Sequence, residues 1–235
     1  MQESNKFWDN RKIYPSITTT EPIWKNQIKE LKELGLKEFC LFLTCLDKKK
    51  REALYKILGE LKIEKIPLIH IKEDMELGEL DYLVKKYKPE AFNIHSQRQY
   101  PFNPSQAKYK DIIFIENSVV SLEEEELRAF AGVCLDLSHL EEARLLNPSL
   151  YQNYVEILKK FPCGCNHISA IKESPFKKDG ELKYSCHYLA KLSELDYLKR
   201  FPREYFSSII ALELENTISQ QLKARDYIID LLKDK

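Results

Sequence analysis

Short apolar segments alternate with charged, amphipathic segments along most of this 235-residue chain. The apolar segments are rich in β-branched and aromatic residues and predict eight strands. These strands lie at roughly residues 12–20, 38–45, 66–71, 91–96, 111–117, 132–138, 163–171 and 207–215. The intervening segments show helical periodicity, clearest for Trp24, Ile28, Leu31 and Leu34. Because right-handed crossovers place helices outside a parallel sheet, the alternation predicts an α/β fold, a (β/α)8 TIM barrel with some helices short or missing.

An open, doubly wound sheet is the alternative fold. Sheets of that kind that bind dinucleotides carry a glycine-rich turn after the first strand, but SITTTEPIW at residues 16–24 contains no glycine. With six glycines in the whole chain, a dinucleotide-binding motif is excluded as well. The length suits one large α/β domain, so we expect a single barrel domain over residues 1–235.

Two connections depart from the alternation of strand and helix. The segment QRQYPFNPSQAKYK at residues 97–110 contains two prolines, so the helix between strands four and five is expected to be short or missing. The loop after strand seven, residues 172–188, is long and polar. Loops at the C-terminal face of a barrel shape its active site, and this one is a candidate lid.

The charge composition restricts the partners and the location of the protein. Lys plus Arg and Asp plus Glu both number 37, so no long-range field attracts nucleic acid or an anionic membrane. No apolar run approaches the roughly 20 residues that cross a bilayer, and MQESNKFWDNRK lacks the apolar core of a signal peptide. Six cysteines are too few for a disulfide scaffold in a chain of this size. We expect a cytoplasmic protein with reduced thiols, a small-molecule partner, and neither nucleic acid nor membrane as partner.

All five histidines fall at the end of a predicted strand or in the loop that follows it: His70, His95, His139, His167 and His187. Carboxylates take the corresponding positions on other strands, and these are Glu116, Asp136 and Glu213. In a parallel barrel the C-terminal ends of the strands meet around one opening, so residues far apart in sequence can ligate one ion. Imidazoles and carboxylates together suit a divalent metal. An enzyme is therefore the leading hypothesis.

Each of these residues also has a purely structural interpretation. A single buried histidine is often a core or capping residue, Glu116 could cap the next helix, and Asp136 could pair with a neighbouring strand. Burying unpaired carboxylates in an apolar strand is costly, which favours the site. Glu213 and Glu215 share a strand face, and deeper placement favours Glu213. Period-two alternation puts the carboxylates on inward faces with Asn93, His95, Phe114, Cys134 and Ala211.

Five short motifs, taken in order, resemble the successive strand-end motifs of the xylose-isomerase-like barrel superfamily. They are FNIH, IFIENS, CLDLSHLEEA, NHIS and ALELEN. The resemblance covers roughly residues 66–235, and its most specific part is the DxxH of Asp136 and His139, which follows the E-N pair of Glu116 and Asn117. That superfamily includes sugar isomerases and epimerases and endonuclease-IV-type enzymes.

The epimerase branch implies one divalent ion held by Glu116, Asp136, His167 and Glu213. The ligand types leave Mn, Zn, Co and Mg open. By the same resemblance, Glu116 and Glu213 exchange the substrate proton across a metal-held enediolate, while His139 and His187 contact substrate oxygens. The expected activity is isomerisation or epimerisation of a sugar or sugar phosphate.

The endonuclease-IV branch gives the alternative, a zinc phosphodiesterase acting on abasic DNA. Histidines on early strands help to hold its zinc cluster, which would give His70 and His95 a second metal; otherwise they line the pocket. Ser185 stands where that branch has a carboxylate two residues before its histidine, which counts against a full cluster. A second alternative is a non-catalytic barrel with a vestigial metal site. The sequence leaves the oligomeric state open, with a homodimer as one option.

Overall fold

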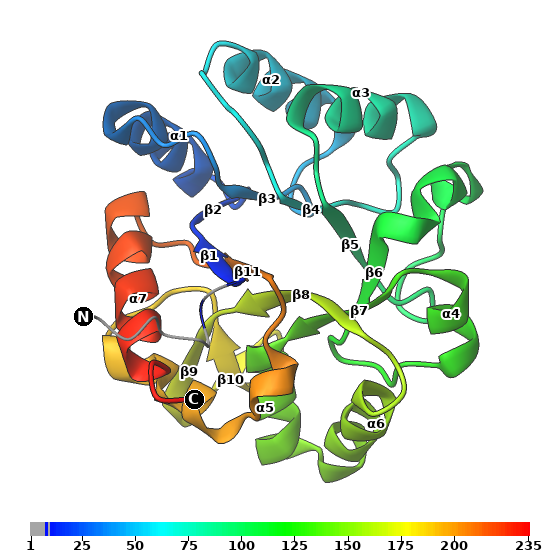
Figure 1. Cartoon of the computed structure of the whole chain (residues 1–235), viewed down its shortest axis with the longest axis vertical. Helices are drawn as coiled ribbons and strands as arrows, with labels where there is room; N and C mark the ends of the chain where they lie inside the picture. The colour runs from blue at the N-terminus through cyan, green and yellow to red at the C-terminus, as the bar shows by residue number, and fades with distance from the viewer. Residues whose placement is uncertain (1–7, 9) are drawn as a thin grey trace.

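The computed structural model describes Trp8 and residues 10–235. In this part of the chain, nine parallel strands form one sheet in the order β1-β11-β8-β7-β6-β5-β4-β3-β2. The sheet curls into a nearly closed barrel with the helices outside it (Figure 1). The predicted TIM barrel is confirmed. The prediction that the chain carries no signal peptide rests mainly on residues 1–7 and 9, which lie outside the described residues.

The barrel strands are β1 (Lys12–Tyr14), β2 (Ser16–Thr18), β3 (Cys40–Phe42), β4 (Leu68–His70), β5 (Ala91–His95), β6 (Ile113–Glu116), β7 (Gly132–Asp136), β8 (Cys163–Ile168) and β11 (Ile209–Leu212). The α-helices are α1 (Ile23–Leu34), α2 (Lys48–Gly59), α3 (Leu77–Tyr87), α4 (Glu124–Ala129), α5 (Leu137–Leu146), α6 (Pro148–Leu158) and α7 (Ile218–Leu231). Three 3-10 helices are η1 (Pro104–Ile112), η2 (Leu192–Arg200) and η3 (Arg203–Tyr205).

The first predicted strand is divided in two at Pro15. Proline has no N–H to donate to a sheet, and the chain changes its pairing partner there. β1 pairs with β11 and β2 pairs with β3, both in parallel. The two halves therefore join the last strand of the barrel to the second, and the remaining seven predicted strands each appear as one shorter strand.

Two buried glutamines complete the junction between β2 and the segment after β11. The Ser16 N–H donates to Gln221 Oε1 at 2.7 Å, and Gln221 Nε2 donates to the carbonyls of Ser16 and Leu214, each at 3.0 Å. The Thr18 N–H donates to Gln27 Oε1 at 3.0 Å, and Gln27 Nε2 donates to the Leu214 carbonyl at 3.0 Å. Side-chain amides from α1 and α7 thus bond backbone groups that no β-ladder reaches here.

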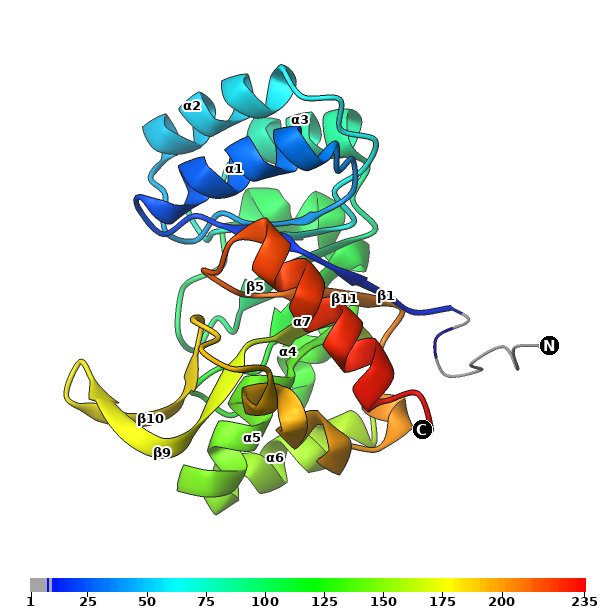
Figure 2. The ribbon, with the colours of Figure 1, turned by 90° about the vertical axis from the view of Figure 1, so that its left-hand side faces the viewer.

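The prediction of a loop at residues 172–188 is corrected by the structure, where most of this segment forms an antiparallel hairpin. Its strands are β9 (Ala170–Lys178) and β10 (Glu181–Cys186), which pair with each other. The turn consists of Asp179 and Gly180, which have φ values of 53° and 83°. Two successive positive φ values are what a two-residue hairpin turn needs, and Asp-Gly is a strong signal for it. The hairpin projects from the body of the molecule (Figure 2).

The other irregular connection behaves as predicted. The segment between β5 and β6 contains the 3-10 helix η1 instead of an α-helix. Its Asn103 side chain accepts the Ser105 N–H at 3.0 Å, and Pro104 follows as the first helical residue. A 3-10 helix of nine residues thus takes the place of the α-helix in this connection.

Apolar residues fill two regions of the molecule. One lies between the barrel and its helices, and the other lies inside the barrel below the strand ends. The interior group consists of Tyr14, Cys40, Phe42, Leu68, Ala91, Cys134, Cys165, Ile209 and Ala211, with Phe114 packed against it. These side chains close the barrel, so the polar residues above them form the floor of a site at the C-terminal ends.

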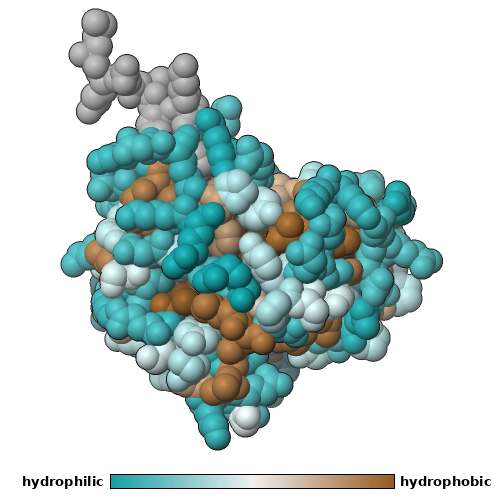
Figure 3. All heavy atoms as spheres, turned by 90° about the horizontal axis from the view of Figure 1, so that it is seen from below, coloured by the Kyte–Doolittle hydropathy of each residue, from teal (hydrophilic) through white to brown (hydrophobic). Residues whose placement is uncertain are grey.

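The surface seen from below is mostly hydrophilic, with a hydrophobic strip near its centre (Figure 3). Helices α5 and α6 lie toward this side in Figure 1, and the exposed hydrophobic residues include Leu145 and Leu146 at the end of α5. Within the described residues, every helix is too short or too polar to span a membrane.

Candidate metal centre

Four side chains meet at the C-terminal ends of neighbouring strands. Glu116 ends β6, Asp136 ends β7, His167 lies in β8 and Glu213 follows β11. One potential ligand atom from each lies within 4.8 Å of the others, and all four residues are buried. A second group, His70, Glu116 and His167, meets the same criterion. The strand register explains the meeting, since Asp136 pairs with His167 across β7 and β8, and Ala211 pairs with His167 across β8 and β11.

Glu116 is surrounded by donors and histidines. Asn93 on β5 donates to its Oε2 at 2.7 Å. His70 Nε2 and His167 Nδ1 each lie 3.5 Å from Oε2, and His95 Nε2 lies 4.0 Å from Oε1. Burial disfavours the charged carboxylate, but the nearby histidines outweigh it and hold the pKa of Glu116 well below its usual range. The side chain does not cap the next helix, so that structural interpretation is excluded.

Asp136 uses its two oxygens differently. Oδ1 caps α5, because it accepts the N–H groups of Ser138 at 2.7 Å and His139 at 2.9 Å. Oδ2 is buried without a hydrogen-bond partner, 3.6 Å from His139 Nε2. Burial raises the pKa of Asp136, and the negative charges of Glu213 and Glu116 add to this, while His139 and His167 oppose it. One oxygen thus fixes the carboxylate, and the other is left for a ligand.

His167 lies between the two glutamates. Its Nδ1 is 3.5 Å from Glu116 Oε2 and 3.4 Å from Glu213 Oε2, without hydrogen-bond geometry to either. The ring of Phe42 packs edge-on against the imidazole, with centroids 4.8 Å apart. Burial alone would lower the pKa of His167, but Glu116 and Glu213 reverse this and raise it well above its usual range.

Glu213 and His187 join the site from the last strand and the hairpin. His187 Nε2 lies 3.7 Å from Glu213 Oε1. Burial opposes ionisation of Glu213, yet His187 and His167 lower its pKa to about 2. Glu215 is less buried, and its N–H donates to the His187 carbonyl at 2.7 Å. The deeper placement expected for Glu213, with Glu215 nearer the rim, agrees with this arrangement.

Histidines on early strands lie at one edge of the cluster. His70 is 2% exposed, and burial lowers its pKa to about 3, so this ring is neutral. The rings of His70 and His95 meet edge-on with centroids 4.8 Å apart. His70 also lies 5.6 Å from His167, centroid to centroid. Both early histidines therefore lie beside Glu116, with their Nε2 atoms 3.5 and 4.0 Å from its carboxylate oxygens.

A pocket of about 510 Å³ is lined by residues of the hairpin together with two histidines of this cluster. Its lining is mostly polar and includes His139, His187, Glu215, Tyr100, Lys178 and Lys183. Burial lowers the pKa of His139, but Asp136 and the glutamates outweigh this and raise it. The described lining does not include Glu116, Asp136, His167 or Glu213. The pocket adjoins these buried residues through His139, 3.6 Å from Asp136, and His187, 3.7 Å from Glu213.

The buried polar atoms fit a metal ion. Among the described residues, His70 Nε2, Asp136 Oδ2, His167 Nδ1 and Glu213 Oε2 are buried without a hydrogen-bond partner. Buried polar atoms are almost always satisfied, and these four belong to residues that surround one small space. Nitrogen and carboxylate oxygen are the ligands that Zn, Mn and Co accept. The residues present therefore suit a divalent cation.

All eight predicted site residues lie close together in the structure, and the roles assigned to them stay predictions. The sequence interpretation gave no role to Asn93, Cys134 or Glu142. Asn93 and Cys134 were placed on inward faces by alternation, but their contacts with Glu116 and His167 depend on strand register. Glu142 on α5 accepts the N–H groups of Tyr184 and Ser185 from the hairpin, and that contact had no sequence signal.

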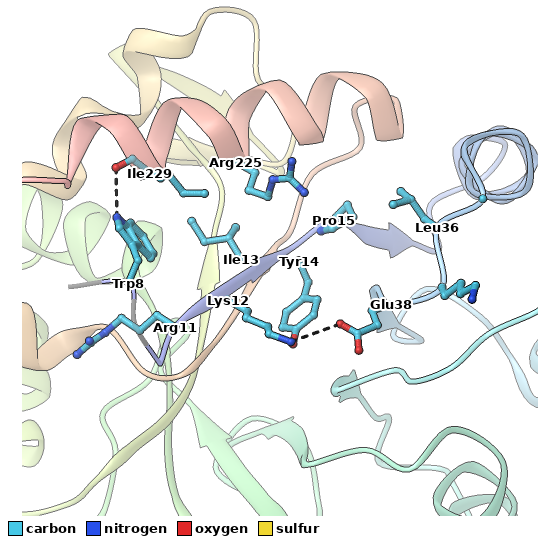
Figure 4. A pocket seen from close by; sticks show the side chains of 12 residues that line it. Trp8, Arg11, Lys12, Ile13, Tyr14, Pro15, Leu36, Glu38, Arg225 and Ile229 are labelled. Atoms are coloured by element: carbon cyan, nitrogen blue, oxygen red, sulfur yellow. Dashed lines mark hydrogen bonds and ion pairs between the residues drawn. The ribbon is translucent and has the colours of Figure 1, made fainter. Parts of the chain in front are cut away.

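Another pocket, of about 550 Å³, lies around β1 at the opposite ends of the strands (Figure 4). Trp8 Nε1 donates there to the Ile229 carbonyl at 3.2 Å, and Lys12 pairs with Glu38 at 3.8 Å. Its described lining includes none of the predicted site residues. The chemistry described above belongs to the C-terminal face.

Comparisons with known proteins add little to this description. No protein-family model matches the sequence, and no curated protein matches it significantly. Among solved structures, the chain is similar to one described as "1.8 A Crystal structure of IOLI protein with a binding zinc atom". The two share 13% identity over 93% of this chain and 98% of the other, with a TM-score of 0.49. A similarity of this size carries no functional assignment, and the barrel is established by its own strand pairing.

Proposed function

We propose that this protein is a divalent-metal-dependent isomerase or epimerase acting on a sugar or sugar phosphate. The observation that supports it is the placement of Glu116 and Glu213 on either side of His167, 3.5 and 3.4 Å from its Nδ1. Isomerisation moves a proton from one carbon to the next, and epimerisation returns it to the other face of the same carbon. Both need a base that removes the proton and an acid that returns it. Two ionised carboxylates facing one small space can share these tasks.

The roles of the side chains follow from their positions. Glu116, Asp136, His167 and Glu213 would hold the ion, which would polarise substrate oxygens when bound. Glu116 and Glu213 would take and return the proton on carbon. His139 and His187 line the pocket and would donate hydrogen bonds to substrate hydroxyls. The polar pocket that these two histidines line has a volume of about 510 Å³, room for a small polyhydroxy compound.

The test is proton exchange on carbon. Protein purified without an affinity tag is loaded with Mn, Zn, Co or Mg and incubated in deuterated water with a panel of ketoses, aldoses and their phosphates. We expect deuterium to enter one substrate, detected by NMR, and Glu116→Gln and Glu213→Gln each to abolish it. Glu33→Gln, at an exposed glutamate of α1 outside the pocket, is the control and should retain activity. No exchange on any substrate with any ion would contradict the proposal.

A hydrolase of abasic DNA is the second candidate, and one observation favours it. His70, Glu116 and His167 form a second group of close ligand atoms, which shares Glu116 and His167 with the first, and His95 lies 4.0 Å from Glu116. Two ions sharing Glu116 could activate water for phosphodiester cleavage. Nicking of an abasic duplex that chelator abolishes and His70→Ala weakens would promote this candidate. A vestigial site would instead show as metal-free protein whose Tm is unchanged by Glu116→Gln and Asp136→Asn.

A further inference from the structure

We propose that Cys134 is a positioning residue that determines which ring nitrogen of His167 faces the metal centre. This inference rests on the proposed metal centre. Cys134 lies on β7, two residues before Asp136, and is fully buried. Its Sγ lies 3.4 Å from His167 Nε2, within hydrogen-bond distance for sulfur.

The contact leaves one nitrogen for the ion. An imidazole has two nitrogens, and Nδ1 of His167 is the one directed at Glu116 and Glu213. If Nδ1 gives its lone pair to a cation, the ring proton must lie on Nε2. That N–H then donates to the Cys134 sulfur. A ligating histidine usually donates its second N–H to a carboxylate, a carbonyl or water, and here a thiol takes that position.

The surroundings explain why a thiol suits this position. Cys134 belongs to the apolar group inside the barrel, with Phe42, Cys165 and Ala211. A fourth carboxylate below three others would add repulsion and a further desolvation cost. A neutral sulfur is a weak acceptor that tolerates an apolar environment. The Phe42 ring also packs edge-on against His167 and restricts the imidazole.

Strand register brings the two residues together. β7 and β8 pair Cys134 with Cys165 and Asp136 with His167. The register shifts between Val133 and Cys134, where Gly164 is the extra residue of β8. A side chain on Gly164 would meet the Phe114 ring at 2.0 Å, so this bulge requires glycine. The irregularity places the thiol directly below the imidazole.

The test uses Zn²⁺ alone and reads both the ring nitrogens and the affinity. In Zn²⁺-loaded wild-type protein labelled with ¹⁵N-histidine, we expect NMR to show His167 bound through Nδ1 with the proton on Nε2. Cys134→Ala should weaken Zn²⁺ affinity about 10–100-fold, as loss of a ligand's hydrogen-bond partner typically does. Cys134→Ser, which keeps an acceptor, should recover most of this. Cys40→Ala, equally buried in the same interior group, is the matched control and should keep wild-type affinity.

The outcomes separate this inference from the metal centre itself. Zn²⁺ bound through Nε2, or a folded Cys134→Ala protein with unchanged Zn²⁺ affinity and His167 tautomer, would overturn the role of Cys134 alone. Wild-type protein that takes up no Zn²⁺ would overturn the metal centre and this inference with it. If Cys134→Ala fails to fold, the wild-type NMR spectrum still tests the proposal, because Zn²⁺ bound through Nε2 would overturn it.

Discussion

At the residue scale, the two carboxylate oxygens of Asp136 have different tasks: Oδ1 caps α5, and Oδ2 is free for a metal ligand bond. Substitutions can distinguish the two tasks. Asp136→Asn keeps the oxygen that caps α5 but removes the free carboxylate oxygen, whereas Asp136→Ala removes both. We expect the alanine variant to be less stable than the asparagine variant by about 0.5–2 kcal/mol, the usual value of a helix cap. Both should lose metal binding. Urea unfolding and Zn²⁺ titration measure the two effects, and equal stability of the variants would contradict the assigned cap.

The charge of His167 predicts a pH dependence. In the metal-free protein burial lowers the pKa of His167, but Glu116 and Glu213 raise it well above 6.5. Stability from this proton is therefore full below about pH 6.5 and is lost as the pH rises through the raised pKa. Metal must displace the proton from Nδ1, so metal affinity changes in the opposite direction.

We expect Mn²⁺ affinity to rise by up to about tenfold per pH unit above pH 6.5, the limit for one displaced proton. Glu213, with a pKa of about 2, stays ionised in this range and contributes nothing to the slope. Calorimetry in buffers of different ionisation enthalpy counts the released protons. Affinity that stays constant or falls as the pH rises would exclude His167 as the competing group.

The sequence indicated which residues would lie together because several apolar runs stop at an ionisable group, as at His70, His95, Glu116 and Asp136. The sequence does not show which of these side chains contact each other. Asn93 bonds Glu116 from a neighbouring strand, and Cys134 reaches His167 only through a register set by one bulge. Contacts of this kind depend on which residues of two strands stand opposite each other, and no single segment encodes that.

At the scale of elements, the hairpin β9–β10 depends on one helix residue. Glu142 Oε2 on α5 accepts the N–H groups of Tyr184 and Ser185 at 2.6 and 2.7 Å and the Ser185 hydroxyl at 2.9 Å. These bonds meet β10 where its register with β9 shifts, between Lys183 and Ser185. The helix that Asp136 caps therefore also holds the hairpin that leads to His187.

Glu142→Ala should release β10 without unfolding the barrel. We expect faster amide exchange across Glu181–Cys186 in hydrogen-exchange mass spectrometry, because its backbone loses acceptors fixed to the body. Under the proposed function, KM should rise through displacement of His187. Glu173→Ala, an exposed position on the same hairpin outside the measured segment and the pocket, is the control. Unchanged exchange in the Glu142→Ala hairpin would show that the pairing with β9 suffices.

At the scale of the whole molecule, ring closure depends on amide side chains. We expect Gln221→Leu to destabilise the protein by about 3 kcal/mol or more, since each buried backbone group left unbonded costs about 1–3 kcal/mol. Guanidinium unfolding measures this loss. Gln152→Leu, an exposed glutamine on α6, should change stability little. If both variants unfold alike, the glutamine contacts contribute nothing to closure.

The overall barrel was predictable because eight apolar runs alternate with amphipathic helices, a pattern with one dominant solution. The way in which the barrel closes could not be predicted from the sequence. Gln27 and Gln221 are polar residues in helices and look like surface positions, yet their exposures are 1% and 0%. The hairpin shows the reverse case, because Asp179 and Gly180 signal a tight turn but Pro175 and the surrounding charges resemble a loop.

The division of the first strand at Pro15 has a consequence for biosynthesis. β1 needs β11 as its partner, and β11 is the last barrel strand to leave the ribosome. Until then β1 and β8 each lack a neighbour, and the candidate centre has Glu116, Asp136 and His167 but not Glu213. We therefore expect a nascent chain to capture its ion only when the ring closes, so that metal uptake marks a finished molecule.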